Sequence, residues 1–352
     1  MDSQQRLAAV LRGERPDRVP YQDAFWQTTI ERWHREGLPS AVSPDEYFGC
    51  EIAGIGGDYT LRLPPRLLAE TARYRVYVDA DGATRRELRT GDGWTPQWLD
   101  FAIKSREDWQ RYRERSAFVA ARLPADVAAR YAAARAAGKF VAFRAHACFH
   151  PTWHKIGLER LLVAMLEEPA WIDSMFAAHT DLIIALYEGC KARGVRFDAA
   201  WLADDLGYRT APLISPRLYR ALVLPHHRRA CQRFAADGIP TILHSDGDVR
   251  PLIPHFLEAG FSCLHPLEVK AGLDVADLKA RYGRALVCFG NIDARALAGS
   301  RAQIEAEVCG KLAAGMRDAG YIFHTDHSVP ADVPFANYCF AVSLLEKHGR
   351  YG

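Results

Sequence analysis

From about residue 140 onward, short apolar runs alternate with segments of helical period, and this alternation limits the possible folds more than any other feature. Strands that alternate with helices indicate parallel strands joined by helical crossovers. Helix-like stretches lie between the runs, for example at 251–259, 274–282 and 301–319. The apolar runs are FVAFRAH (140–146), DAAWLADD (198–205), PTILHSDG (240–247), SCLHPLE (262–268), RALVCFGNID (284–293) and GYIFHTDH (320–327).

Two further strand candidates precede these six runs, RVPYQDAF (18–25) and EIAGIGG (51–57). The total of eight is the strand number of a (β/α)8 barrel. A doubly wound open sheet is the alternative, but it would normally carry a glycine-rich phosphate loop after its first strand. The sequence contains neither GxGxxG nor GxxxxGK[ST]. We therefore expect an α/β fold, a (β/α)8 TIM barrel, in a single domain that spans 1–352.

The first 120 residues differ from the regular pattern that follows. The segment 2–12 is predicted to be a short amphipathic helix. A β-hairpin is expected over 72–89, where YRVYV and TRREL alternate on either side of the turn DADG. The region 1–120 is thus expected to be an N-terminal extension of the barrel that contains helices and a hairpin.

Composition excludes several classes of protein. The 352 residues contain 45 Lys+Arg and 43 Asp+Glu, so a net charge of +2 gives no reason to expect a nucleic-acid partner. No uncharged apolar stretch reaches the length of a membrane helix, and the start MDSQQRL lacks the apolar core of a signal peptide. The eight cysteines are scattered and form no CxxC motif. We expect a cytoplasmic protein with no membrane partner.

Polar side chains follow each apolar run at the point where the predicted strand ends. Because the carboxyl ends of barrel strands meet at one mouth, we expect these groups to lie together there. Polar groups at such a rim are costly to bury unless they bind something or one another. The residues concerned are His146, Asp204, Asp205, His244, Asp246, His265, Glu268, Asn291, Asp293, His324, Asp326 and His327.

Several of these residues also have a structural interpretation. Asp204, Asp205, Asp246 and Asp293 are each suited to cap a following helix. His265 precedes Pro266 and is equally well explained as a packed loop histidine.

Other histidines and the tryptophans are read in the same way. His146, His150 and His154 have the spacing of one helix face, although Pro151 favours a structural role for His154. Surface positions are expected for His226 and His227, and a core or surface position for His179. The tryptophans that would suit an aromatic substrate, or simply the core, are Trp26, Trp94, Trp98 and Trp153.

His244, Asp246 and His327 are the candidate metal ligands. Residues i and i+2 of a strand point to the same side, so His244 and Asp246 can address one ion. Two imidazoles and a carboxylate suit a catalytic zinc that keeps an open position.

The chain resembles the uroporphyrinogen decarboxylase superfamily over nearly its whole length. The segments that carry the resemblance are LAAVLRGERPDRVP (7–20), ADDLGYRTAPLISPRLYRALVLPHHRR (203–229), the stretch 242–283, FGNIDARALA (289–298) and HTDHSVPADVPFANY (324–338). The resemblance implies a (β/α)8 barrel with an N-terminal extension.

The superfamily contains two chemistries, and the sequence resembles the methyltransferase branch more closely. The decarboxylases carry an RQAGR-like motif near the N-terminus, where this chain reads YQDAFWQTTIERW (21–33). The methyltransferases work with corrinoid proteins or coenzyme M and bind zinc through an HxC motif and a late cysteine. The corresponding positions here read His244-Ser245-Asp246 and Asp326-His327. This replacement of both cysteines implies a harder, more Lewis-acidic metal site.

The resemblance therefore implies a methyltransferase that moves a methyl group from a small O- or N-methylated substrate to a corrinoid protein or a related acceptor. No DxHxxG corrinoid motif is present, so a separate protein would carry the corrinoid. Zinc at His244, Asp246 and His327 is the expected metal, and a monomer or homodimer the expected state. The expected catalytic residues are Asp205, Glu268 and His146, and the expected substrate-binding residues are Asp204, Asn291, Asp326 and Arg144.

The alternative is a cofactor-free decarboxylase or lyase that acts on a carboxylated substrate. In that case Asp205 and His146 would be the acid and base, and Arg144 or Arg209 would bind the substrate carboxylate through the planar guanidinium. The missing RQAGR-like motif counts against this alternative.

Overall fold

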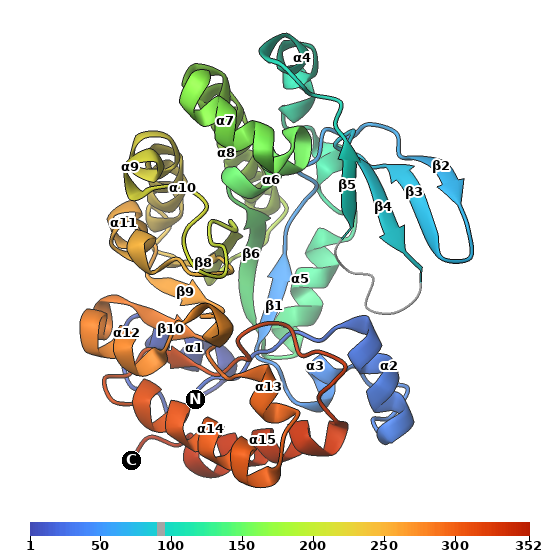
Figure 1. Ribbon diagram of the computed structural model, residues 1–352. Coiled ribbons are helices and arrows are strands. Elements are labelled where there is room, and N and C mark those ends of the chain that lie inside the picture. The colour runs from blue at the N-terminus through green and yellow to red at the C-terminus, as the bar shows by residue number, and fades with distance from the viewer. Residues whose placement is uncertain (90–95) are drawn as a thin grey trace.

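A computed structural model describes residues 1–89 and 96–352, and its central feature is a parallel sheet of seven strands in the order β1-β6-β7-β8-β9-β10-β11 (Figure 1). All six apolar runs after residue 140 contain one of these strands, as predicted. The strands are β1 (Ile52–Ile55), β6 (Phe140–His146), β7 (Ala199–Ala203), β8 (Thr241–His244), β9 (Cys263–His265), β10 (Val287–Phe289) and β11 (Tyr321–Ile322). The polar ends of most runs lie beyond the last paired residue, in the loops that follow.

The sheet is curled, and one segment contacts both of its edges. The Phe323 N–H, just after β11, donates to the Pro20 carbonyl at 2.9 Å, and the Glu51 N–H, just before β1, donates to the Tyr21 carbonyl at 3.0 Å. The expected strand over 18–25 is not continuous, because only isolated bridges form there, at Arg18, Tyr21 and Phe25. The fold is therefore α/β with a curled parallel sheet.

The longer helices cover the outer face of this sheet (Figure 1). The predicted helix over 301–319 ends early, at Gly315, whereas those over 2–12, 251–259 and 274–282 are confirmed within a residue or two. The helices are α1 (Ser3–Leu11), α2 (Gln27–Glu36), α3 (Pro44–Tyr47), α4 (Arg106–Tyr112), α5 (Val127–Ala136), α6 (Phe149–Ile156), α7 (Leu158–Glu167), α8 (Pro169–Ala192), α9 (Pro216–Leu218), α10 (Leu224–Ala235), α11 (Ile253–Ala259), α12 (Val275–Tyr282), α13 (Ala294–Leu297), α14 (Arg301–Gly315) and α15 (Phe335–His348). None of the described helices is both long and apolar enough to cross a bilayer.

Helix α1 fills the amino-terminal end of the curled sheet. Its Leu7, Val10 and Leu11 belong to one buried cluster with inward-facing strand residues such as Phe140 and Ile242. The same end is fastened by Arg6, whose Nη1 donates to Oε2 of the buried Glu51 at 2.5 Å. Since this end is packed, the space within the sheet opens at the carboxyl ends of the strands.

A second, antiparallel sheet of four strands lies beside the first (Figure 1). The hairpin expected over 72–89 is confirmed and forms the centre of this sheet, but its two flanking strands were not predicted. The strands are β2 (Arg66–Glu70), β3 (Tyr74–Val78), β4 (Thr84–Leu88) and β5 (Gln97–Asp100). Trp94 lies outside the described residues.

Candidate active site at the carboxyl ends of the strands

A cavity of about 990 Å³ lies at the carboxyl ends of the parallel strands. Ten residues were expected from the sequence to be catalytic, to bind substrate or to bind metal, and six of these ten line the cavity: Arg144, His146, Asp205, His244, Asp246 and His327. The cavity lining does not include the other four, Asp204, Glu268, Asn291 and Asp326. The seven histidines in the lining are His146, His150, His154, His244, His265, His324 and His327.

Asp246 is the centre of the polar cluster. Its Oδ1 lies 3.7 Å from Nε2 of His244, and its Oδ2 lies 3.8 Å from Nε2 of His327. Nε2 of His244 is also 3.5 Å from Oδ1 of Asp205. One group of possible metal ligands is therefore Asp205, His244 and Asp246, with one atom of each within 4.8 Å of the others.

A second group shares Asp246 and adds Glu268 and His327. The three expected metal ligands, His244, Asp246 and His327, therefore do not belong to one group. The two histidines face different oxygens of Asp246. Glu268 is nearly buried behind the lining, where its Oε2 accepts from the Gly247 N–H at 2.9 Å and its Oε1 pairs with Lys270.

Burial and neighbouring charges separate the pKa values of the two aspartates. Burial, together with the charges of Asp205 and Glu268, raises the pKa of Asp246 above its ordinary value. Burial would also raise the pKa of Asp205, but His150 and His244 hold it below its usual range. Oδ1 of Asp246 is buried and has no hydrogen-bond partner among the described residues. The cluster thus offers nitrogen and oxygen ligands of the kind that zinc accepts, and one ligand atom is left unsatisfied.

His265 lies behind His244, with the Nδ1 atoms of the two rings 2.7 Å apart. One ring must donate and the other accept, so this contact couples the tautomers of the two rings, and it leaves Nε2 of His244 facing the aspartates. Burial lowers the pKa of both rings, that of His265 well below 6.5. His265, for which a packed role was the structural alternative, is a member of the site and also orients His244.

The mouth of the cavity is formed by α6 and the antiparallel sheet. The rings of His150 and His154 on α6 are 4.3 Å apart, and Nδ1 of His150 lies 2.8 Å from Oδ2 of Asp205. From β5, the indole of Trp98 packs 4.8 Å from the His154 ring and 5.2 Å from Trp153. The sequence interpretation missed His150 and set His154 aside, although the i, i+4, i+8 spacing was the signal that could have placed both here.

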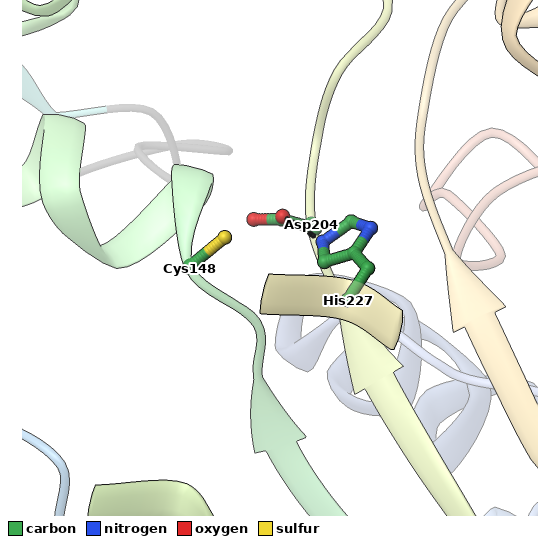
Figure 2. Close-up of side chains that lie close together, drawn as sticks. All are labelled: Cys148, Asp204 and His227. Carbon is green, nitrogen blue, oxygen red and sulfur yellow. Dashed lines mark hydrogen bonds and ion pairs between the residues drawn. The ribbon is translucent and has the colours of Figure 1, made fainter. Parts of the chain in front are cut away.

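Asp204 lies in a buried network behind the cavity. Its carboxylate accepts from the N–H groups of Phe149 and His150 at 3.2 and 2.6 Å, at the start of α6, and lies 2.7 Å from Nε2 of His227. Figure 2 shows Asp204, Cys148 and His227 facing one another from three different elements. These three form a further possible ligand group, but all are fully buried and Asp204 is already satisfied. Asp204 therefore caps α6 rather than facing a substrate.

The surface positions expected for His226 and His227 are wrong. Both rings are buried, because α10 packs its apolar side against the sheet and each ring meets a carboxylate there: Asp173 at 2.8 Å and Asp204 at 2.7 Å. His179 belongs to the core, where its Nε2 lies 3.0 Å from the His146 carbonyl.

Asn291 and Asp326 hold loops in place rather than lining the cavity. The Asn291 amide donates to the Leu267 and Leu273 carbonyls at 2.7 and 2.9 Å. Asp326 accepts from the Val269 and Ala294 N–H groups, both at 3.1 Å. Asp293 caps α13, as its structural alternative predicted.

The fold and the cavity together define an α/β protein whose polar, histidine-rich site lies at the carboxyl ends of a curled parallel sheet. The sequence pattern of uroporphyrinogen decarboxylase (URO-D) matches residues 99–348, and the chain belongs to this family of enzymes.

Individual relatives bear different names. The chain is 33% identical over 181 residues to a uroporphyrinogen decarboxylase of Nocardia farcinica, and the aligned region covers 49% of this chain and 48% of the relative. It is 31% identical over 110 residues to a methylated-thiol–coenzyme M methyltransferase of Methanosarcina mazei, and this aligned region covers 31% of the chain and 28% of the relative. The matches thus span about half or less of the curated relatives' length.

A solved structure, a methyltransferase from Methanosarcina mazei, has the same fold. It aligns with a TM-score of 0.70 at 18% identity and covers 99% of both chains.

Proposed function

We propose that the protein is a methyltransferase that takes a methyl group from a small O- or N-methylated substrate and transfers it to a reduced corrinoid on a separate protein. The observation that carries the proposal is the cluster of Asp205, His244 and Asp246 at the cavity, where one carboxylate oxygen of Asp246 is buried without a hydrogen bond among the described residues. The methyltransferase among the relatives and the absence of an RQAGR-like motif at 21–33 support this choice.

The chemistry explains why such a cluster is needed. The bond between the methyl carbon and its oxygen or nitrogen breaks with both electrons left on the heteroatom. The methyl carbon forms its new bond with an electron pair of the corrinoid cobalt. An alkoxide or amide leaves poorly, so the heteroatom must be coordinated or receive a proton.

The metal proposed for this site is zinc, held by His244 and Asp246 with Asp205. His327 faces the second oxygen of Asp246, and Glu268 belongs to the same possible ligand group as these two residues. Bound there, zinc supplies Lewis acidity to the leaving heteroatom. Glu268 and His146 are the proposed acid–base groups beside the zinc. Asp205, a zinc ligand in this arrangement, would act as an acid or base only without a metal. Asp204, Asn291 and Asp326 act indirectly, by holding α6 and the neighbouring loops.

The architecture proposed to present this site is a single domain over 1–352, a closed (β/α)8 barrel. Residues 20–22 would take the place of the eighth strand, because their hydrogen bonds reach both edges of the parallel sheet. The antiparallel sheet within 1–120 would be the extension that covers the mouth. The proposed cellular location is the cytoplasm, and the proposed state a monomer or homodimer.

A cofactor-free decarboxylase is the second candidate, and one observation favours it. Arg144 faces the cavity, where a substrate carboxylate would meet it, and Asp205 and His146 are at hand as acid and base. In that case no metal is needed.

The metal content of the purified full-length protein separates the two candidates. We expect about one zinc per chain in the parent and in His154→Gln, a cavity histidine outside both ligand groups. In His244→Ala and Asp246→Ala the zinc should be lost. Methoxylated and methylamine compounds would then be screened with a reduced corrinoid protein. A parent that binds zinc no better than His244→Ala overturns the methyltransferase proposal and favours the decarboxylase.

A further inference from the structure

Arg144 is the most unusual charge in the cavity. It lies on β6, exposed to the cavity, and its guanidinium stacks on the ring of Trp201 at 3.7 Å from the centroid. Its guanidinium makes no hydrogen bond or ion pair with any residue within 1–89 or 96–352. Arg144 is thus a cation that is open to the cavity and has no protein anion beside it.

Arg144 is charged at neutral pH. The surrounding protein lowers the pKa of Arg144 to about 10, an effect that Tyr59 partly offsets, so the guanidinium keeps its proton. Nε2 of His265, another residue of the lining, is buried without a hydrogen bond among the described residues.

The backbone makes room for this arrangement. A Cβ at Gly54 of the adjacent strand β1 would come within 2.6 Å of Cγ of Arg144. Glycine there lets the long side chain lie along the inside of the sheet, over the indole.

Arg144 sits one layer deeper than the polar rim. It is opposite Trp201 in the register of β6 and β7, whereas His146 is opposite Ala203, which in turn is opposite His244. Two residues along a strand correspond to about 7 Å. Any anion on Arg144 would therefore lie below the groups that face the rim.

From this geometry we infer that the floor of the cavity, Arg144 over Trp201, is a binding site for a carboxylate carried by the substrate. A planar guanidinium matches a carboxylate through paired N–H donors, and a single cation suits a monoanion. The carboxylate enters first and the opposite end of the substrate stays at the rim. That the rim end carries the methylated heteroatom rests on the proposed function, whereas the carboxylate site itself does not.

The difference in depth between Arg144 at the floor and the polar groups at the rim limits the length of the substrate. About 7 Å between layers suits a carboxylate separated from the reacting atom by a benzene ring or a short alkyl chain. Methoxybenzoates and similar small methylated acids are the class that fits both ends.

The test is calorimetric binding of 4-methoxybenzoate and of its uncharged counterpart 4-methoxybenzamide to the full-length protein without corrinoid. We expect the parent to prefer the acid by at least tenfold. Arg144→Gln should bind the acid about 10- to 100-fold more weakly, since a charged hydrogen bond is lost. Arg209→Gln is the matched control, because Arg209 is exposed and outside the cavity lining, and it should change the affinity less than twofold.

A second measurement protects the test against misfolding. Without ligand, Arg144→Gln should melt no lower than the parent, because the guanidinium is exposed to the cavity and makes no hydrogen bond or ion pair within the described residues. Equal binding of the acid by the parent and Arg144→Gln, or no preference for acid over amide, overturns the inference. Methyl transfer is not involved in either measurement, so a protein that binds the acid but transfers no methyl group contradicts only the proposed function.

Discussion

Asp204 and His227 form a fully buried pair, with Nε2 of His227 2.7 Å from Oδ2 of Asp204 and neither side chain more than 1% exposed. The pair joins the end of β7 to α10, and through the two N–H groups that Asp204 accepts it also fixes the start of α6. Because α6 carries His150 and His154 into the cavity, this buried contact sets the shape of the site from behind.

Removal of His227 should therefore destabilise the whole protein. In His227→Leu the Asp204 carboxylate stays buried and loses its imidazole partner, which costs about 3–5 kcal/mol of unfolding free energy. Urea unfolding followed by circular dichroism measures this loss. The control is Tyr219→Phe, which removes only the 2.8 Å contact of the hydroxyl with Nδ1 of His227 and should cost about 1–3 kcal/mol. Equal losses in the two variants would argue against a buried charge on Asp204.

His265 should affect metal binding without being a ligand. It contacts His244 through the two Nδ1 atoms and so orients the ring. Loss of such an outer partner lowers metal affinity about 10- to 100-fold. We expect that decrease for zinc in His265→Phe, measured by competition with a chelator, and complete loss in His244→Ala. Unchanged zinc affinity in His265→Phe would show that His244 needs no support from behind.

Glu51 should be the main polar support at the amino-terminal end of the sheet. It is 2% exposed, accepts from the Tyr21 N–H at 2.9 Å and pairs with Arg6 at 2.5 Å and Arg18 at 2.9 Å. Glu51→Ala leaves the buried Arg6 with less compensation and should cost about 3–5 kcal/mol in urea unfolding.

Asp17 provides the matched control for Glu51. It also pairs with Arg6, at 2.7 Å, but its side chain is 40% exposed, so Asp17→Asn should cost no more than about 1 kcal/mol. If Asp17→Asn loses as much unfolding free energy as Glu51→Ala, burial of Glu51 does not make its charge more important than that of the exposed Asp17.

The parallel sheet could be predicted from the sequence because most residues of β6 to β11 are buried and these strands read as apolar runs. FVAFRAH predicts β6 residue by residue. The flanking strands of the antiparallel sheet could not, since all five residues of β2 are exposed and RLLAE has no period of two. The segment 18–25 reads as a strand but forms only isolated bridges, at Arg18, Tyr21 and Phe25.

The site was predictable in position but only partly in composition. Strand ends converge, so Asp205, His244 and Asp246 could be placed together. Asp204 follows the same rule but occupies the next position along the chain, and successive side chains alternate in direction, so it faces the helices instead of the cavity. The spacing of His150 and the strand-end position of His265 are visible in the sequence, but their contacts with Asp205 and His244 join different elements, and no local pattern encodes those.

Acid should destabilise the protein partly through His179. This ring is buried against the His146 carbonyl, and burial lowers its pKa from 6.5 to about 3. Between these values the unfolded chain binds a proton at His179 and the folded chain does not. Stability therefore falls as pH decreases through this window, by about 1.4 kcal/mol per pH unit from this one group.

The variant His179→Gln isolates this contribution, because the amide can still donate to the carbonyl but does not titrate. Urea unfolding at a series of pH values from about 6 to 4 should give a shallower fall for the variant than for the parent, by about one proton. His348→Gln, at an exposed position at the end of α15, should follow the parent. Parallel curves for His179→Gln and the parent would mean that the folded protein admits a proton at His179, and the ring would then have to be open to solvent through the cavity.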